Sequence, residues 1–349
     1  MQRPPVPDRD RPPPEPDSGA EARTEPRTGI GAPAEEAVRE IVRAALAGAA
    51  LGQGPAPGPE PASLPALSLI DEGGEHFSWW VGSRHVLRLA PDRDATVRQR
   101  REIRLRDLVR PYIGVPVPSR IASGTWGPGL GYTLDQRLFG ASGEERPVSV
   151  AGEPDLAGLL SGLRSVPVRE AAALGVPQAP PRSLDRLRAE AERPARLLTA
   201  DGEFDAGRLT RLTAHTAERL TPRAGAVVVH HDLKGEHLLV TGDGRVCGVL
   251  DWTDAVVGDP AEDIGGLALS VGAPAAVRAA TLAGSGPREC LRGLWLARCD
   301  TVIRLADRLY GTDDSPLPLL RTQLQRAWEP ILLERLGDVE PDAPDPNEA

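Results

Sequence analysis

The spacing of hydrophobic positions changes near residue 150. Before it, short apolar runs separated by Gly, Pro and Ser are typical of strands, which we expect at residues 77–81, 86–89 and 131–139 and in a region opening at 115. After it, apolar residues recur at helical intervals. Helices are expected at residues 35–51, 95–108, 156–163, 168–174, 183–198, 209–220, 261–269, 274–283, 289–310 and 317–336. The pattern predicts an α+β protein with a strand-rich first lobe and a helical second lobe.

One hairpin interrupts the helical part. The apolar run Val227–Val229 leads into a polar loop, and the run Leu238–Val240 leads out of it to a turn and a returning strand that ends on Asp251. We expect Asp232 and Asp251 to lie at strand ends on the edge of one small sheet, with His237 between them. Phosphoryl transfer needs such a layout, because one carboxylate orients the attacking hydroxyl and another holds magnesium on the phosphates.

Composition shifts divide the chain into five parts. Residues 1–34 are rich in Pro and in charge, so we expect a disordered tail. Residues 35–64 read as a helix and a proline-rich linker, 65–144 as the first lobe and 145–336 as the second. The acidic residues 337–349 are expected to form a flexible tail.

Composition also indicates which partners and which cellular compartment to expect. A net charge of −9 over 349 residues argues against a nucleic-acid partner and would suit a cationic small substrate. The three cysteines have no metal or disulfide spacing, so they are expected to be reduced thiols. We see no signal peptide, and the longest weakly polar run, residues 44–51, is too short to span a bilayer. We therefore expect a cytoplasmic protein without a membrane partner.

The segment from His230 to Asp251 resembles the catalytic core of the aminoglycoside phosphotransferase family, relatives of the protein kinases. The resemblance rests on His230-x-Asp232 and on Leu250-Asp251-Trp252, and it extends over about residues 65–336. It implies a two-lobed protein-kinase-like fold. It also implies transfer of the γ-phosphate of ATP, or another nucleoside triphosphate, to the hydroxyl of a small-molecule alcohol, with Mg²⁺ as cofactor.

The resemblance assigns roles in the second lobe. Asp232 would accept a hydrogen bond from the substrate hydroxyl, and Asp251 would bind magnesium. His237 stands where the family usually has a metal-binding Asn, so a nitrogen ligand would shift the preference towards Mn²⁺. We expect His230 to be structural and Asp259, before a proline, to cap a helix.

In the first lobe, Arg88 matches the strand cation that holds the nucleotide phosphates, because its planar fork can grip phosphate oxygens. Glu102 would pair with it. Gly73 and Gly74 occupy the position of the glycine loop, although no G-x-G-x-x-G is present. Residues 133–137 would supply the connection between the lobes and its backbone contacts to the purine.

Other readings stay open at this point. Asp232 could cap a turn, Glu102 could be a surface charge on an arginine-rich helix, and His237 could only stabilise its loop. The change from Asn to His and the poor glycine loop also allow a catalytically weak or silent nucleotide-binding homologue. The pair at 231 and 232 could suggest a metal-dependent HD-type phosphohydrolase, but those domains are all-helical whereas strands are expected around this pair.

Overall fold

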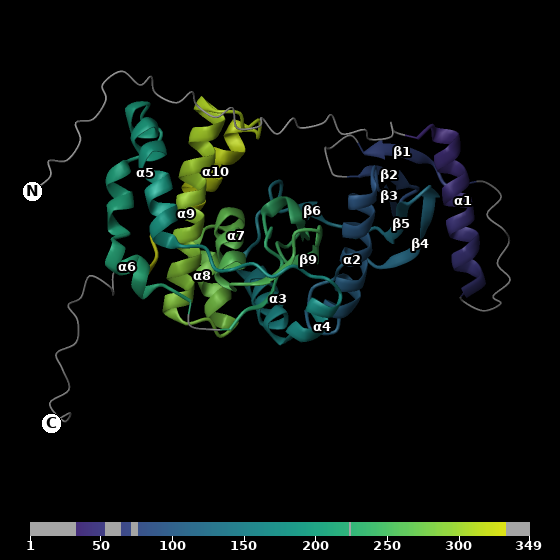
Figure 1. The fold of residues 1–349 in the computed structure, drawn as a ribbon, viewed down its shortest axis with the longest axis horizontal. Helices are drawn as coiled ribbons and strands as arrows, with labels where there is room; N and C mark the ends of the chain where they lie inside the picture. The colour runs from purple at the N-terminus through teal and green to yellow at the C-terminus, as the bar shows by residue number, and fades with distance from the viewer. Residues whose placement is uncertain (1–32, 53–63, 71–75, 223–224, 333–349) are drawn as a thin grey trace, which may run out of the picture.

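The structure is a computed structural model that describes residues 33–52, 64–70, 76–222 and 225–332. Figure 1 shows two lobes side by side, with a strand-rich lobe at one end and a helical lobe at the other. The protein is therefore α+β and two-lobed, as the hydrophobic pattern predicted.

The first lobe is built on an antiparallel five-stranded sheet in the order β1-β2-β3-β5-β4. Its strands are β1 (Leu67–Ile70), β2 (Phe77–Val81), β3 (His85–Leu89), β4 (Arg120–Gly127) and β5 (Leu130–Gln136). The hairpin of β2 and β3 is confirmed. The strand region expected from residue 115 begins at Arg120 instead, because Pro116 and Pro118 have no N–H to donate to a neighbouring strand.

One helix packs on each face of this sheet. Helix α2 (Arg93–Val109) begins where the Asp92 side chain accepts a hydrogen bond of 2.7 Å from the backbone N–H of Ala95. Helix α1 (Glu35–Gly52) lies on the opposite side of the sheet in Figure 1. Its apolar face joins Trp79 and Leu87 in a small core, a contact that the sequence pattern did not assign.

The second lobe holds most of the helices and the larger core. Its elements include α3 (Glu153–Ser165), α4 (Val168–Ala173), α5 (Leu184–Ala200), η2 (Ala206–Arg211), α6 (Ala214–Arg219), α7 (Ala261–Val271), α8 (Ala273–Leu282), α9 (Pro287–Tyr310) and α10 (Leu317–Ala327). Within the described ranges, no helix has the length and apolar content that crossing a bilayer would require.

Two helix predictions were wrong in extent. The helix expected at 209–220 is broken into η2 and α6, because Thr213 lies between them and its hydroxyl accepts from the backbone N–H of Thr216 at 3.1 Å. The helix expected at 317–336 ends at Ala327, before Pro330, which cannot continue a helix.

The short strands of the second lobe form two small sheets rather than the single one expected. They are β6 (Ala141–Ser142), β7 (Val227–Val229), β8 (Leu238–Val240), β9 (Val246–Val249) and β10 (Val256–Gly258). The predicted hairpin of β8 and β9 is present, with β6 added at its edge, but β7 pairs with β10. The expectation that Asp232 and Asp251 follow strands of one sheet is therefore wrong. They follow β7 and β9, whose two sheets meet at the loops described next.

Candidate active site

The loop after β7 carries Asp232 and is held by a carboxylate on α7. The backbone N–H groups of His230 and His231 donate to the two oxygens of Asp263, each at 2.8 Å. His231 has a φ of 69°, a conformation that costs a non-glycine residue free energy and persists only where neighbours impose it. Asp263 is buried, and burial raises its pKa to about 6. The two bonds thus fix the turn that presents Asp232.

His230 joins this loop to the one that carries Asp251. Its ring is fully buried, and Nε2 lies 2.9 Å from the carbonyl oxygen of Leu250. A carbonyl can only accept, so Nε2 carries the proton. Burial and the neighbouring His237 lower the pKa of His230 to about 4. These contacts match the structural role expected for this histidine.

His237 lies between the two aspartates. It ends the short 3-10 helix η3 (Gly235–His237), and its Nδ1 is 2.8 Å from the backbone carbonyl oxygen of Asp232. Nδ1 must therefore donate, which leaves the lone pair on Nε2. Nε2 lies 3.8 Å from Oδ2 of Asp251. A backbone carbonyl that fixes the tautomer of a histidine in this way is typical of metal-binding imidazoles.

Asp251 is the second residue with a strained backbone, at a φ of 52°. Its Oδ1 accepts from the backbone N–H of Thr253 at 3.2 Å. Burial alone would raise its pKa, but His237, Thr253 and Arg88 outweigh that effect and hold the pKa of Asp251 below its ordinary value. The carboxylate is thus charged and turned towards His237.

Arg88 on β3 and Glu102 on α2 form the ion pair that the sequence predicted. Glu102 is 1% exposed and also accepts from the Thr253 hydroxyl at 3.4 Å, so the pair reaches the loop after Asp251. Burial alone would lower the pKa of Arg88. The negative charges of Glu102, Asp135 and Asp251 outweigh burial and raise this pKa. The Arg88 Nε is buried with no hydrogen-bond partner in the described part of the chain. A buried N–H without a partner is costly, and a phosphate oxygen would satisfy it.

Lys234 is a site residue that sequence reasoning missed. Its Nζ lies 2.5 Å from Oδ1 of Asp232 and 3.9 Å from Glu236. The available signal was a cation two positions after the aspartate in the same loop. The ammonium can balance the charge of Asp232 and of a phosphate brought next to it.

The donor set fits a divalent cation. Two ligands of one Mg²⁺, each about 2.1 Å from it, must lie within about 4 Å of one another, as Nε2 of His237 and Oδ2 of Asp251 do. Asp232, Glu236 and His237 form a second group, whose ligand atoms lie within 4.8 Å of one another. One imidazole among carboxylates would accept Mn²⁺ at least as readily as Mg²⁺.

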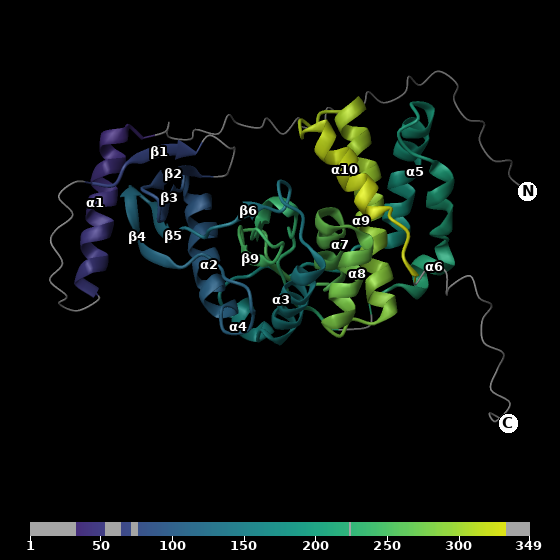
Figure 2. The same ribbon diagram turned by 180° about the vertical axis from the view of Figure 1, so that it is seen from behind.

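Two other predicted parts of the site have different outcomes. Gly73 and Gly74 lie outside the described residues. The connection between the lobes begins later than expected, because β5 extends to Gln136 and the Arg137 N–H bonds the carbonyl of Arg84 at 2.7 Å. Residues 137–140 therefore form the connection, since β6 already belongs to the second lobe. In Figures 1 and 2, β6 and β9 lie between α2 and α7.

A cavity of about 400 Å³ opens beside Asp232, between the loop after β7, α7 and α9. Arg182 crosses its wall and pairs with Glu262 at 2.6 Å and Asp300 at 2.9 Å. Arg304, also in the lining, lies 3.9 Å from an oxygen of Asp313. The cavity is large enough for a drug-sized molecule.

The chain shares sequence and fold with known phosphotransferases. The family model described as "Phosphotransferase enzyme family" (APH) matches residues 67–295. Viomycin phosphotransferase of Streptomyces vinaceus is 31% identical over 206 residues, which are 55% of this chain and 69% of that protein.

Solved structures show the same fold. The GDP complex of wild-type aminoglycoside 2'-phosphotransferase-IIIa superposes with a TM-score of 0.59 at 18% identity, over 76% of this chain and 93% of that one. The GDP and kanamycin complex of APH(2")-IIia gives a TM-score of 0.54 at 18% identity, over 76% and 94%. The kinase-like fold is confirmed, and the all-helical HD-type alternative is wrong, because β7 and β8 flank the loop that carries Asp232.

Proposed function

The chain belongs to the phosphotransferase enzyme family, and we propose that it moves the γ-phosphate of ATP, or of another nucleoside triphosphate, to a hydroxyl of a small molecule. This proposal rests on one observation: residues from both lobes meet at a single site. His237 lies between Asp232 and Asp251, and the hydroxyl of Thr253, two residues after Asp251, donates to Glu102, the partner of Arg88 in the first lobe. The GDP complex of a fold relative supports nucleotide binding without deciding which base is used.

Each residue of the site has a role in this proposal. Arg88, held by Glu102, would grip the phosphates through its free Nε–H. Asp251 and Nε2 of His237 would hold Mg²⁺ or Mn²⁺, which neutralises charge on the transferred phosphate. By the family resemblance, the backbone N–H groups of Gly73 and Gly74 would complete the nucleotide site.

Asp232 would accept the hydrogen bond of the acceptor hydroxyl and align its oxygen with the γ-phosphorus. Lys234, 2.5 Å from Asp232, would remain paired with it and offer its other protons to the γ-phosphate oxygens. The ammonium would balance the charge of the carboxylate as the phosphate approaches, so the two residues would act as one unit.

The acceptor would be a small-molecule alcohol that enters the cavity beside Asp232. The cavity is lined by three carboxylates, of Asp232, Glu262 and Asp300, and by three cations, of Arg182, Lys234 and Arg304. The charges of the lining balance, so charged groups of either sign on the acceptor would find a partner there. Relatives act on viomycin, and one is seen with kanamycin, so basic antibiotics are the first acceptors to test.

A cytoplasmic location would fit this function, since it supplies nucleotide and keeps thiols reduced. The cysteines at 247, 290 and 299 are free, which supports a reducing compartment.

The test is phosphate transfer from labelled ATP, and separately GTP, to a panel of alcohols of graded charge, with Mg²⁺ or Mn²⁺. We expect a labelled acceptor for the wild type and a loss on the order of 10²-fold in Asp232→Asn, which keeps the size of the side chain but not its basicity. Binding of nucleotide without any transfer would favour the silent homologue. Unchanged transfer in folded Asp232→Asn would overturn the assignment of that residue.

A further inference from the structure

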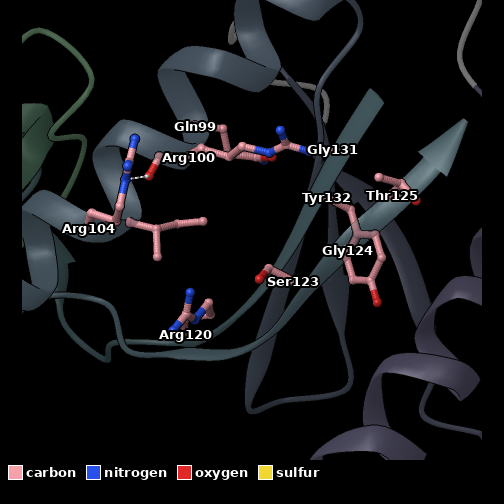
Figure 3. A pocket seen from close by; sticks show the side chains of 10 residues that line it. Gln99, Arg100, Arg104, Arg120, Ser123, Gly124, Thr125, Gly131 and Tyr132 are labelled. Carbon is pink, nitrogen blue, oxygen red and sulfur yellow. Dashed lines mark hydrogen bonds between the residues drawn. The ribbon is translucent and has the colours of Figure 1, made fainter. Parts of the chain in front are cut away.

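A second pocket lies in the first lobe, and none of its lining residues borders the cavity beside Asp232. It occupies about 550 Å³ between α2 and the strands β4 and β5. Figure 3 shows Arg100 and Arg104 on the helix and Arg120 on the facing strand, around the same space. The cavity is of the size that small-molecule sites have.

The lining of this pocket is cationic in an acidic protein. Three guanidinium groups line it, and none of its lining residues is a carboxylate. The nearest carboxylate that an ion pair connects to it is Asp107, 3.8 Å from Arg120.

Two of the three guanidinium groups come from successive turns of α2. Arg100 and Arg104 are one helical turn apart, and the Nε of Arg104 donates to the backbone carbonyl of Arg100 at 3.2 Å, which turns its side chain back along the helix. Like charges at this spacing repel one another and weaken a helix. An anion bound between them would convert that repulsion into attraction.

The other lining groups are polar and suit an oxygen-rich ligand. Ser123 and Thr125 on the edge strand β4 offer hydroxyls. Gln99 forms the buried floor, 1% exposed, and its amide donates to the backbone carbonyl of Arg88 at 3.1 Å. The pocket is thus joined, through one side chain, to the strand that carries the cation of the candidate active site.

We propose that this pocket binds a small ligand bearing several phosphate groups, and that the bound ligand ties α2 to β4. Guanidinium forks bind phosphate oxygens in pairs, and three forks around one cavity match a di- or triphosphate better than a single carboxylate. Because Glu102 lies on α2, the ligand would steady the helix that positions Arg88. The binding itself does not depend on the proposed function, whereas this last consequence does.

The shared chemistry could come from a free polyphosphate or from a second nucleotide, and a titration separates the two. The full-length protein is titrated by calorimetry with a non-hydrolysable ATP analogue and Mg²⁺, at roughly 50 mM salt so that screening stays weak. Two analogues bound per chain in the wild type and one in Arg104→Gln/Arg120→Gln would identify a nucleotide. If both proteins bind one analogue per chain, the pocket does not take a nucleotide, and inorganic tripolyphosphate is titrated next.

We expect tripolyphosphate to bind the analogue-saturated wild type and to bind the double variant at least 10-fold more weakly. Arg186→Gln is the matched control, because Arg186 is a guanidinium on α5, 82% exposed and outside this pocket. Hydrogen exchange of the α2 amides should slow with the ligand in the wild type and in the control only. Equal affinity in all three proteins, or no binding of either probe outside the nucleotide site, would overturn the proposal. If the protein bound no nucleotide, the tripolyphosphate titration would still decide it.

Discussion

His230 should make the protein lose stability in mild acid. Its ring is fully buried and donates from Nε2 to the carbonyl of Leu250, while its Nδ1 is buried without a hydrogen-bond partner in the described ranges. Protonation of Nδ1 would place a second donor and a full charge in a space that offers no acceptor. The folded protein therefore keeps this histidine neutral.

The size of the effect follows from the pKa. Burial lowers the pKa of His230 from 6.5 to about 4, so between these values the unfolded chain binds a proton that the folded chain does not. Stability then rises with pH across this window, is fully present above 6.5 and is lost as pH falls towards 4. At pH 4.5 the loss for this one group is about 2.5 kcal/mol relative to pH 7.

The variant His230→Gln isolates this contribution, because the amide can still donate to Leu250 but does not titrate. A comparison is needed because Asp263 acts with the opposite sign. Its pKa is raised from 3.8 to about 6, so its contribution to stability falls as pH rises through that range, in both proteins alike.

The assay is urea unfolding of both proteins, followed by circular dichroism at pH 7 and 4.5 without added metal. We expect the free energy of unfolding of the wild type to drop by about 2–3 kcal/mol more than that of His230→Gln. Parallel losses in the two proteins would show that His230 is already protonated when folded, and that its placement between the two loops is wrong.

Four further predictions concern the site. Asp251→Ala should lose metal-dependent nucleotide binding, measured by calorimetry, and unchanged affinity with metal would remove Asp251 from the site. His237→Asn should show a smaller Mn²⁺ over Mg²⁺ advantage in turnover than the wild type, because it restores an oxygen ligand, and an identical ratio would leave His237 a loop residue only. Arg88→Ala should weaken ATP binding more than Arg88→Lys, which keeps the charge but not the fork, and three equal dissociation constants would contradict the pairing with the phosphates. Lys234→Ala should lower kcat by roughly 10-fold or more with little change in KM for ATP, whereas an unchanged kcat would show that Lys234 only shields Asp232.

The elements that sequence predicted well are those set by local pattern. The hairpin of β8 and β9 and the helix around Glu102 were found because periodicity and turn residues are local properties. The errors fall where a single residue overrides the pattern. Thr213 splits one expected helix and Pro330 limits another, and in both places the apolar spacing continues past the break.

The parts that sequence could not predict depend on contacts between distant segments. The pairing of β7 with β10, rather than with the nearby hairpin, is a choice between equally apolar strands that tertiary packing decides. The amphipathic pattern of helix α1 predicts that one of its faces is buried, but it does not indicate that the sheet covers this face. Lys234 was passed over because a lysine in a polar loop is ordinary until its distance to Asp232 is known.

The short motifs around Asp232 and Asp251 therefore do not determine the geometry of the site by themselves. His231 and Asp251 both adopt a left-handed backbone, and each such residue costs on the order of 1–3 kcal/mol. The restraint on the first is Asp263, 32 residues away on α7, and the restraint next to the second is the bond from His230 to Leu250. Asp263 lies in the first turn of α7, where carboxylates are common because they interact favourably with the helix dipole. Its contact with the loop after β7 therefore cannot be inferred from the sequence. A chain with the same loop and no carboxylate at 263 would match the motif equally well, yet its Asp232 would not be presented in this way.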